Sequence, residues 1–153
     1  MPGNRFHHIS ITTSKFTLTS KLIEGQYPKY EMVIPNNAKN TIVLDKASLK
    51  KSLSRIDILS SEEYHGVRFE IADKLLKISI NSPQHESAEE EIDVEFDGEP
   101  LDIAFNVSYL IDVLGVLANE KVRITLLDSN SSALVEDGDE SNSALYVVMP
   151  MRL

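Results

Sequence analysis

The chain has 153 residues, 42% of them hydrophobic, no cysteine, and a formal net charge of −9 from 15 basic and 24 acidic residues. The length predicts one domain, or one domain with a fragment of another, and the lack of cysteine excludes disulfides, thiolate metal ligands and a thiol nucleophile. The acidity argues against tight nucleic-acid binding by the whole surface. Neither an apolar run of about 20 residues nor a secretory signal at residues 1–5 is present, and the lack of cysteine is consistent with a cytosolic address as well as with export.

Two β-rich segments come first, at residues 5–12 and 16–23, with a hairpin turn at residues 13–15. From residue 41 the same order of elements occurs twice, namely a short strand, a helix and three strands. The first set is expected at 41–44, 45–59, 67–72, 75–80 and 90–96, and the second at 101–104, 106–118, 122–127, 133–136 and 144–149. This repeat of element order predicts an α+β fold of two β-α-β-β-β units, with two helices packed side by side on antiparallel sheets.

The two predicted helices differ in their apolar faces. In the first, Asp45 is a candidate N-cap and a narrow apolar stripe is formed by Leu49, Leu53 and Ile56. Opposite this stripe or flanking it are the cations Lys46, Lys50, Lys51 and Arg55. By themselves, these cations are more typical of a solvated helix surface whose charge is favoured by the helix dipole than of a binding surface. The second helix is apolar over most of its circumference, so we expect it to be deeply packed.

The sequence contains no constellation typical of catalysis. The four histidines are scattered, and His7 and His8 would point to opposite faces of a strand, so they cannot easily share a metal ion. Residues 128–139 resemble a calcium loop in their alternating oxygen ligands but lack glycine at the sixth position and glutamate at the twelfth. The acidic run at residues 86–91 is interpreted as a solvated segment that prevents an edge strand from pairing with other chains, rather than as a surface that binds a partner. We therefore expect no enzyme activity, no metal and no cofactor.

The last ten residues, 144–153, run from an apolar strand into a methionine-rich tail. Pro150 cannot donate to a sheet ladder, so the strand should end at Met149. Methionine adapts its shape to varied neighbours. The pattern alone leaves two interpretations open, a structural plug for the domain or one wall of a binding groove.

Three segments together resemble the bacterial DNA polymerase III beta sliding clamp family. Residues 105–114 are similar to the second helix of its third domain, residues 144–153 to its C-terminus, and residues 20–30 to its hinge between the middle and last domains. The chain is identified as a member over essentially its whole length. The resemblance implies the DNA clamp fold, with residues 1–24 as the last hairpin of the middle domain and 25–153 as the C-terminal domain. It also implies a non-enzymatic, cytoplasmic bacterial protein that forms part of a homodimeric ring around duplex DNA and confers processivity on the replicative polymerase.

Three functional surfaces are implied by the resemblance. A groove for Gln-Leu-Phe-type peptides of replicative and repair polymerases, the clamp loader and mismatch-repair proteins would use Pro28, Met32, Val33, Asn106, Tyr109, Ser132, Val147, Met149, Pro150, Met151, Arg152 and Leu153. A weakly contacting DNA-facing surface would use Lys46, Lys50, Lys51 and Arg55, and the ring interface Ile58 and Leu59. Met32 stands where relatives often have arginine, which removes a cationic contact, and Asn130 replaces an apolar residue near the rim. The alternative is a stand-alone protein-interaction module of clamp fold that does not encircle DNA.

Overall fold

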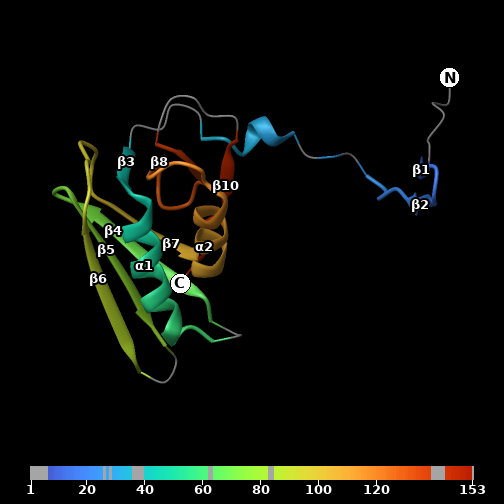
Figure 1. The fold of residues 1–153 in the computed structure, drawn as a ribbon. Helices are drawn as coiled ribbons and strands as arrows, with labels where there is room; N and C mark the ends of the chain where they lie inside the picture. The colour runs from blue at the N-terminus through green and yellow to red at the C-terminus, as the bar shows by residue number, and fades with distance from the viewer. Residues whose placement is uncertain are drawn as a thin grey trace. The chain divides into compact units, whose positions relative to one another are not determined.

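The computed structural model describes residues 7–25, 27, 29–35, 40–61, 64–82, 85–138 and 144–152. The chain divides into two units, Met1–Tyr30 and Glu31–Leu153. The first unit contains an antiparallel hairpin of strands β1 (His8–Thr12) and β2 (Thr17–Lys21), joined by the turn expected at residues 13–15 (Figure 1). The hairpin prediction is therefore confirmed.

The hairpin has one apolar face and one hydroxyl face. Ile9 and Ile11 share a face of β1, and Ile11 pairs with Leu18 of β2. These three side chains are 50%, 51% and 56% exposed. On the opposite face, the hydroxyls of Ser10 and Thr19 hydrogen-bond across the strands at 3.2 Å. A two-stranded hairpin is marginally stable alone in water, so burial of its apolar face against other structure is needed to stabilise it.

Within the described residues, the second unit contains two four-stranded antiparallel sheets and two α-helices, which are labelled in Figure 1. Its first repeat consists of β3 (Asn40–Asp45), α1 (Lys46–Ile56), the 3-10 turn η2 (Asp57–Leu59), β4 (Gly66–Ala72), β5 (Leu75–Asn81) and β6 (Ser87–Asp93). Its second repeat consists of β7 (Leu101–Asn106), α2 (Val107–Val116), β8 (Lys121–Leu126), β9 (Ala133–Asp137) and β10 (Tyr146–Val148). Another 3-10 turn, η1, spans Tyr30–Met32. This architecture confirms the predicted α+β fold with its two strand-helix-three-strand units.

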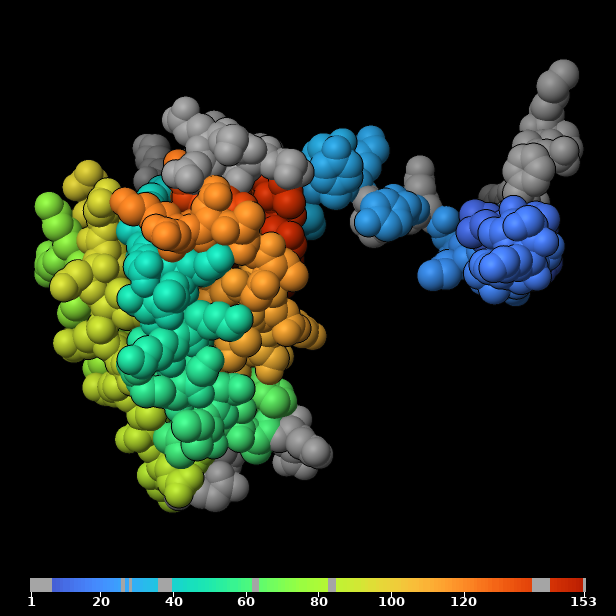
Figure 2. Space-filling view, viewed as in Figure 1, coloured from blue at the N-terminus to red at the C-terminus, as the bar shows by residue number. Residues whose placement is uncertain are grey.

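Each repeat gives its first strand to the sheet of the other repeat. The strand orders are β10-β9-β8-β3 and β6-β5-β4-β7, so β3 pairs with β8 and β7 pairs with β4. The two helices pack against each other on the same side of the sheets, and their surfaces lie next to one another in Figure 2. The exchange of strands joins the two repeats into one core.

The two repeats are related by an offset of 61 positions. The N-caps Asp45 and Asn106 are equivalent by this offset, and the first N–H of each helix donates to the carbonyl before the first long strand of the other repeat. These bonds run from Lys46 to Glu120 at 2.8 Å and from Val107 to His65 at 2.9 Å. The two repeats therefore have closely similar backbone pairing although their sequences are only weakly similar.

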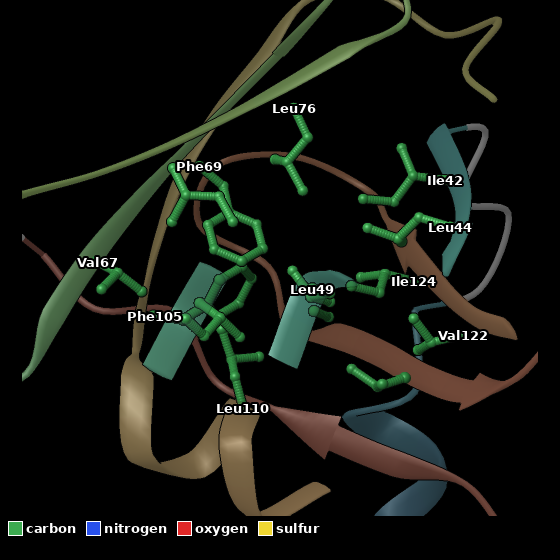
Figure 3. Close-up of a cluster of buried hydrophobic side chains, with 14 of the residues drawn as sticks. Ile42, Leu44, Leu49, Val67, Phe69, Leu76, Phe105, Leu110, Val122 and Ile124 are labelled. Atoms are coloured by element: carbon green, nitrogen blue, oxygen red, sulfur yellow. The ribbon is translucent and has the colours of Figure 1, made fainter. Parts of the chain in front are cut away.

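The core lies between the helices and the sheets (Figure 3). Leu49, Leu53 and Ile56 of α1 are at most 1% exposed, as their stripe predicts. Phe69 of β4 and Phe105 of β7 are fully buried and meet edge to face, with ring centroids 5.6 Å apart. This geometry is favourable for aromatic pairs beyond the area that they bury.

Two expectations about elements were wrong. The third strand of the first repeat, expected at 90–96, is β6 at Ser87–Asp93, because β5 pairs with it from Leu75 to Asn81. Helix α2, all of whose residues the structure describes, is not deeply packed. Only Val107, Leu110 and Leu114 are buried, while Tyr109 and Val116 are 60% and 63% exposed. The reason is that α2 lies beside α1 at the surface, so one face alone meets the sheets.

Candidate functional site

The tail after β10 connects the two sheets. Val148 is 4% exposed and pairs with Ala133 at the edge of one sheet. Three residues later, the backbone N–H of Met151 donates to the carbonyl of Ala104 at 2.8 Å, in the edge strand β7 of the other sheet. The tail therefore has a structural contact, which does not by itself decide between a plug and a groove wall.

The first turn of α2 begins at Val107, three residues after Ala104. Asn106 ends β7, and its Oδ1 accepts from the N–H groups of Ser108 and Tyr109 at 2.9 and 3.4 Å. This cap holds Tyr109 in the first turn with its ring 60% exposed. Since β10 also packs against α2, the capped turn and the tail belong to one region of the surface.

A third segment is attached to this region by Ser132. Its hydroxyl donates to the carbonyl of Val33, and the serine itself is 8% exposed. Ser132 precedes Ala133, the partner of Val148 in the ladder, so Val33 is fixed close to the end of β10. Met32 stands beside Val33 with its side chain 82% exposed.

We call the following residues the tail surface. They are Met32, Val33, Asn106, Tyr109, Ser132, Val147, Met149, Pro150, Met151 and Arg152. Met149 is 60% exposed, Val147, Pro150 and Met151 are half-buried, and Arg152 is exposed. Pro28 and Leu153, which were also predicted for the groove, lie outside the described residues. The tail surface thus offers apolar side chains from three segments beside a helix cap, a composition suited to binding short apolar peptides.

The cations of α1 have different environments. The Nζ of Lys46 donates to the carbonyl of Leu117 at 2.8 Å. Lys50 and Lys51 are exposed and, within the part of the chain that the structure describes, neither forms an ion pair. Arg55 is paired with Glu90 of β6. Of the four predicted DNA-facing residues, Arg55 is therefore neutralised by an ion pair, whereas the three lysines keep their charge and Lys50 and Lys51 are the exposed ones.

Glu90 is a residue that sequence reasoning missed. It belongs to the acidic run interpreted as an edge guard, and Glu89 and Glu91 beside it do face away from α1, since Glu89 pairs with Lys77 at 3.0 Å. Strand alternation turns Glu90 to the opposite face, toward α1. The hydrogen bonds from Arg55 lower the pKa of the Glu90 carboxyl, and those bonds raise the pKa of Arg55.

The two residues predicted for a ring interface lie in η2 and differ in their exposure to solvent. Ile58 is 78% exposed, whereas Leu59 is half-buried and packs against the core. An apolar pair at the end of a helix can belong either to the core or to an interface. The structure leaves Ile58 as the apolar side chain available at this end of α1.

The polar run at residues 128–132 forms a turn. The carboxylate of Asp128 accepts from the N–H groups of Asn130 and Ser131 at 2.8 and 2.7 Å, and these bonds lower the pKa of Asp128. Among the described residues, no group of three histidine or acidic side chains could hold a metal ion. No helix within the described ranges is long and apolar enough to cross a membrane.

Comparisons of sequence and of structure with known proteins identify the same family. The family model described as the DNA polymerase III beta subunit, C-terminal domain, matches residues 31–152. The beta sliding clamps of Pseudomonas aeruginosa and Pseudomonas putida are 54% and 52% identical over 147 residues, which cover 96% of this chain and 40% of each relative. A crystal structure of the DNA polymerase sliding clamp from Pseudomonas aeruginosa with ligand has a TM-score of 0.84 at 52% identity, over 96% of this chain and 40% of that one. The chain thus spans about 40% of the length of the curated relatives it matches, and the predicted family and clamp fold are confirmed.

Proposed function

The chain belongs to the DNA polymerase III beta subunit family, the beta sliding clamps, and we propose that it forms the C-terminal part of a ring that encircles duplex DNA. Such a ring is a non-catalytic processivity factor that tethers the replicative polymerase to its template in the bacterial cytoplasm. Residues 25–153 are the C-terminal domain of the clamp, and residues 1–24 are the last hairpin of the preceding domain. The half-exposed face of Ile9, Ile11 and Leu18 supports this division, because it is an apolar face without a core of its own.

The second part of the proposal is that the tail surface docks short linear peptides. Partners of Gln-Leu-Phe type would come from replicative and repair polymerases, the clamp loader and mismatch-repair proteins. The observation that carries this assignment is the bond from Met151 to Ala104, since it holds the tail next to the Asn106-capped turn of α2. Apolar side chains of the peptide would lie against Met149 and Val147, while polar groups around Asn106 would orient its backbone.

The third part concerns DNA. A ring that encloses its substrate is retained by topology, so it needs few phosphate contacts, and tight ones would hinder sliding. An acidic chain with a small basic face fits this requirement. Lys50 and Lys51 supply that face on α1, with Lys46 beside them. Ile58 is proposed to contact the partner protomer in the closed ring.

Peptide titration tests the docking assignment. A Gln-Leu-Phe-type peptide is titrated against the chain and its Met149→Ala and Met151→Ala variants, with Val116→Ala as matched control because Val116 is equally exposed but lies at the other end of α2. The two methionine variants should bind about fivefold more weakly or worse, as residues central to an interface do. The control should bind like the parent chain.

Equal binding of the peptide by the parent chain and both methionine variants would refute the docking assignment. A chain that binds the peptide but never contacts duplex DNA would favour the alternative, a protein-interaction module of clamp fold without DNA encirclement. These two outcomes come from separate measurements, so one part of the proposal can fail without the other.

A further inference from the structure

Glu90 holds Arg55 in a bidentate ion pair on the side of the domain that is proposed to face DNA. The Nε of Arg55 donates to Oε1 of Glu90 at 2.6 Å and its Nη2 donates to Oε2 at 2.5 Å. Ser52, which is 4% exposed, adds a third donor to the same carboxylate at 3.2 Å. Bidentate arginine-carboxylate pairs are strong and directional, so the guanidinium is fixed toward β6.

The second repeat shows how much depends on this one arginine. The positions of α2 that correspond to Lys46, Lys50, Lys51 and Arg55 at the 61-residue offset are Val107, Ile111, Asp112 and Val116. None of them is cationic, so the positive charge of the paired helices comes from α1 alone. Arg55 is one quarter of that charge, and Glu90 cancels it at close range.

We propose that Glu90 is a brake on DNA contact, a positioning residue that withholds Arg55 from phosphate so that α1 presents the three lysines only. This inference rests on the proposed function, because it presupposes that α1 faces DNA. At about 0.1 M salt, charges interact over about 10 Å. A phosphate close to Arg55 is therefore also repelled by the carboxylate of Glu90, which neutralises the guanidinium. Glu90 thereby limits the number of phosphate contacts, which keeps the grip on DNA weak enough for sliding.

The test compares Glu90→Gln with Glu89→Gln in the whole chain. Both variants remove one negative charge from the same strand, but Glu89 faces the opposite side and pairs with Lys77. Each protein, labelled with nitrogen-15, is titrated with a duplex of about 20 base pairs, and amide shifts report both affinity and location. Glu90→Gln should bind more tightly, with its added shifts on α1 around Arg55, and one extra phosphate contact should steepen the salt dependence by about 0.9. The gain should therefore shrink about three- to fourfold between about 50 and 200 mM salt.

The outcomes separate the inference from the proposed function. Adding Arg55→Gln to Glu90→Gln should abolish the gain, and a gain that persists would overturn the inference. Equal gains for Glu89→Gln and Glu90→Gln would also overturn it, because general charge would then explain both. If the parent chain shifts at Lys50 and Lys51 but Glu90→Gln adds nothing, the brake alone is refuted. If duplex DNA shifts no α1 amide in any folded variant, the DNA-facing role of α1 is refuted with it.

Discussion

Ending the chain after Pro150 tests the two roles of the tail against each other. The truncation removes the N–H of Met151 that donates to Ala104, the half-buried Met151 side chain and the exposed Arg152. It leaves Val148, which is 4% exposed, paired with Ala133. The sheet that contains β10 should therefore survive, and the link to β7 should be lost.

The expected loss of stability is moderate. One backbone hydrogen bond contributes about 0.5–1.5 kcal/mol, and half-burial of a methionine side chain contributes about 1 kcal/mol, half of the range for full burial. Together these predict a decrease of about 2 kcal/mol in the free energy of unfolding. For a unit of this size, the melting temperature should fall by about 6–10 °C. Binding of the Gln-Leu-Phe-type peptide should be lost almost entirely, since three residues of the tail surface or its continuation are gone.

Urea denaturation, thermal denaturation and peptide titration on the same samples provide the measurement. Met151→Ala is the matched control because it keeps the N–H donor to Ala104 and loses only the side chain, so about half of the destabilisation should remain. A loss above about 4 kcal/mol, the range of large core truncations, would identify the tail as a plug and refute this reasoning. An unchanged stability would show that the bridge to Ala104 contributes nothing.

Three further predictions concern the fold that carries the site. Asp45→Ala and Asn106→Ala should each cost about 1 kcal/mol in urea denaturation, because each removes an N-cap; a null effect at both would contradict the cap geometry. Phe105→Ala should cost about 3–5 kcal/mol, because it opens a cavity at a fully buried ring, and a loss below 1 kcal/mol would argue against the core described for β7. Stability should fall in acid. Arg55 lowers the pKa of Glu90 from its ordinary 4.5, and Arg68, which forms an ion pair with Asp102, lowers the pKa of that carboxyl from its ordinary 3.8. The unfolded chain therefore binds protons first as the pH drops. The contribution of these pairs is complete above about pH 5 and is lost progressively below it; a melting temperature that rises on acidification would refute this assignment.

Local sequence patterns predicted most helices and strands of this fold. The features that they did not predict depend on pairing between segments far apart in the sequence. The stripe of Leu49, Leu53 and Ile56 needed only helical periodicity, and the N-cap at Asp45 needed only the residue type. The exchange of β3 and β7 between sheets has no local signal, because each strand reads as a short apolar segment whichever neighbour it pairs with. Counting apolar residues likewise overstated the packing of α2, since a helix beside another helix at the surface buries one face whatever the other contains.

The candidate site divides in the same way. The residues of the tail surface were assigned by resemblance rather than by periodicity, and their role stays a prediction. Glu90 could have been noticed from strand alternation alone, which separates it from Glu89 and Glu91. Its partner Arg55 is 35 positions away, however, and the pairing of a helix with a strand at that distance is set by the packed fold. The sequence could predict that a basic helix face exists, but not how much of its charge is neutralised.

The two repeats show how one scaffold can carry two proposed surfaces. The N-cap side chains act alike, since Asp45 accepts from the N–H of Ser48 at 2.7 Å and Asn106 from that of Tyr109 at 3.4 Å. Ser48 and Tyr109 are equivalent by the 61-residue offset, so the same capped turn presents a small hydroxyl in one repeat and a large aromatic ring in the other. The backbone bridge after the last strand is equivalent too, joining Glu95 to Val43 in the first repeat and Met151 to Ala104 in the second. The backbone pairing shared by the two repeats thus supports both proposed surfaces, and side chains at matched positions make the helix of one repeat basic and the capped turn of the other aromatic, as the proposed contacts with DNA and with peptides require.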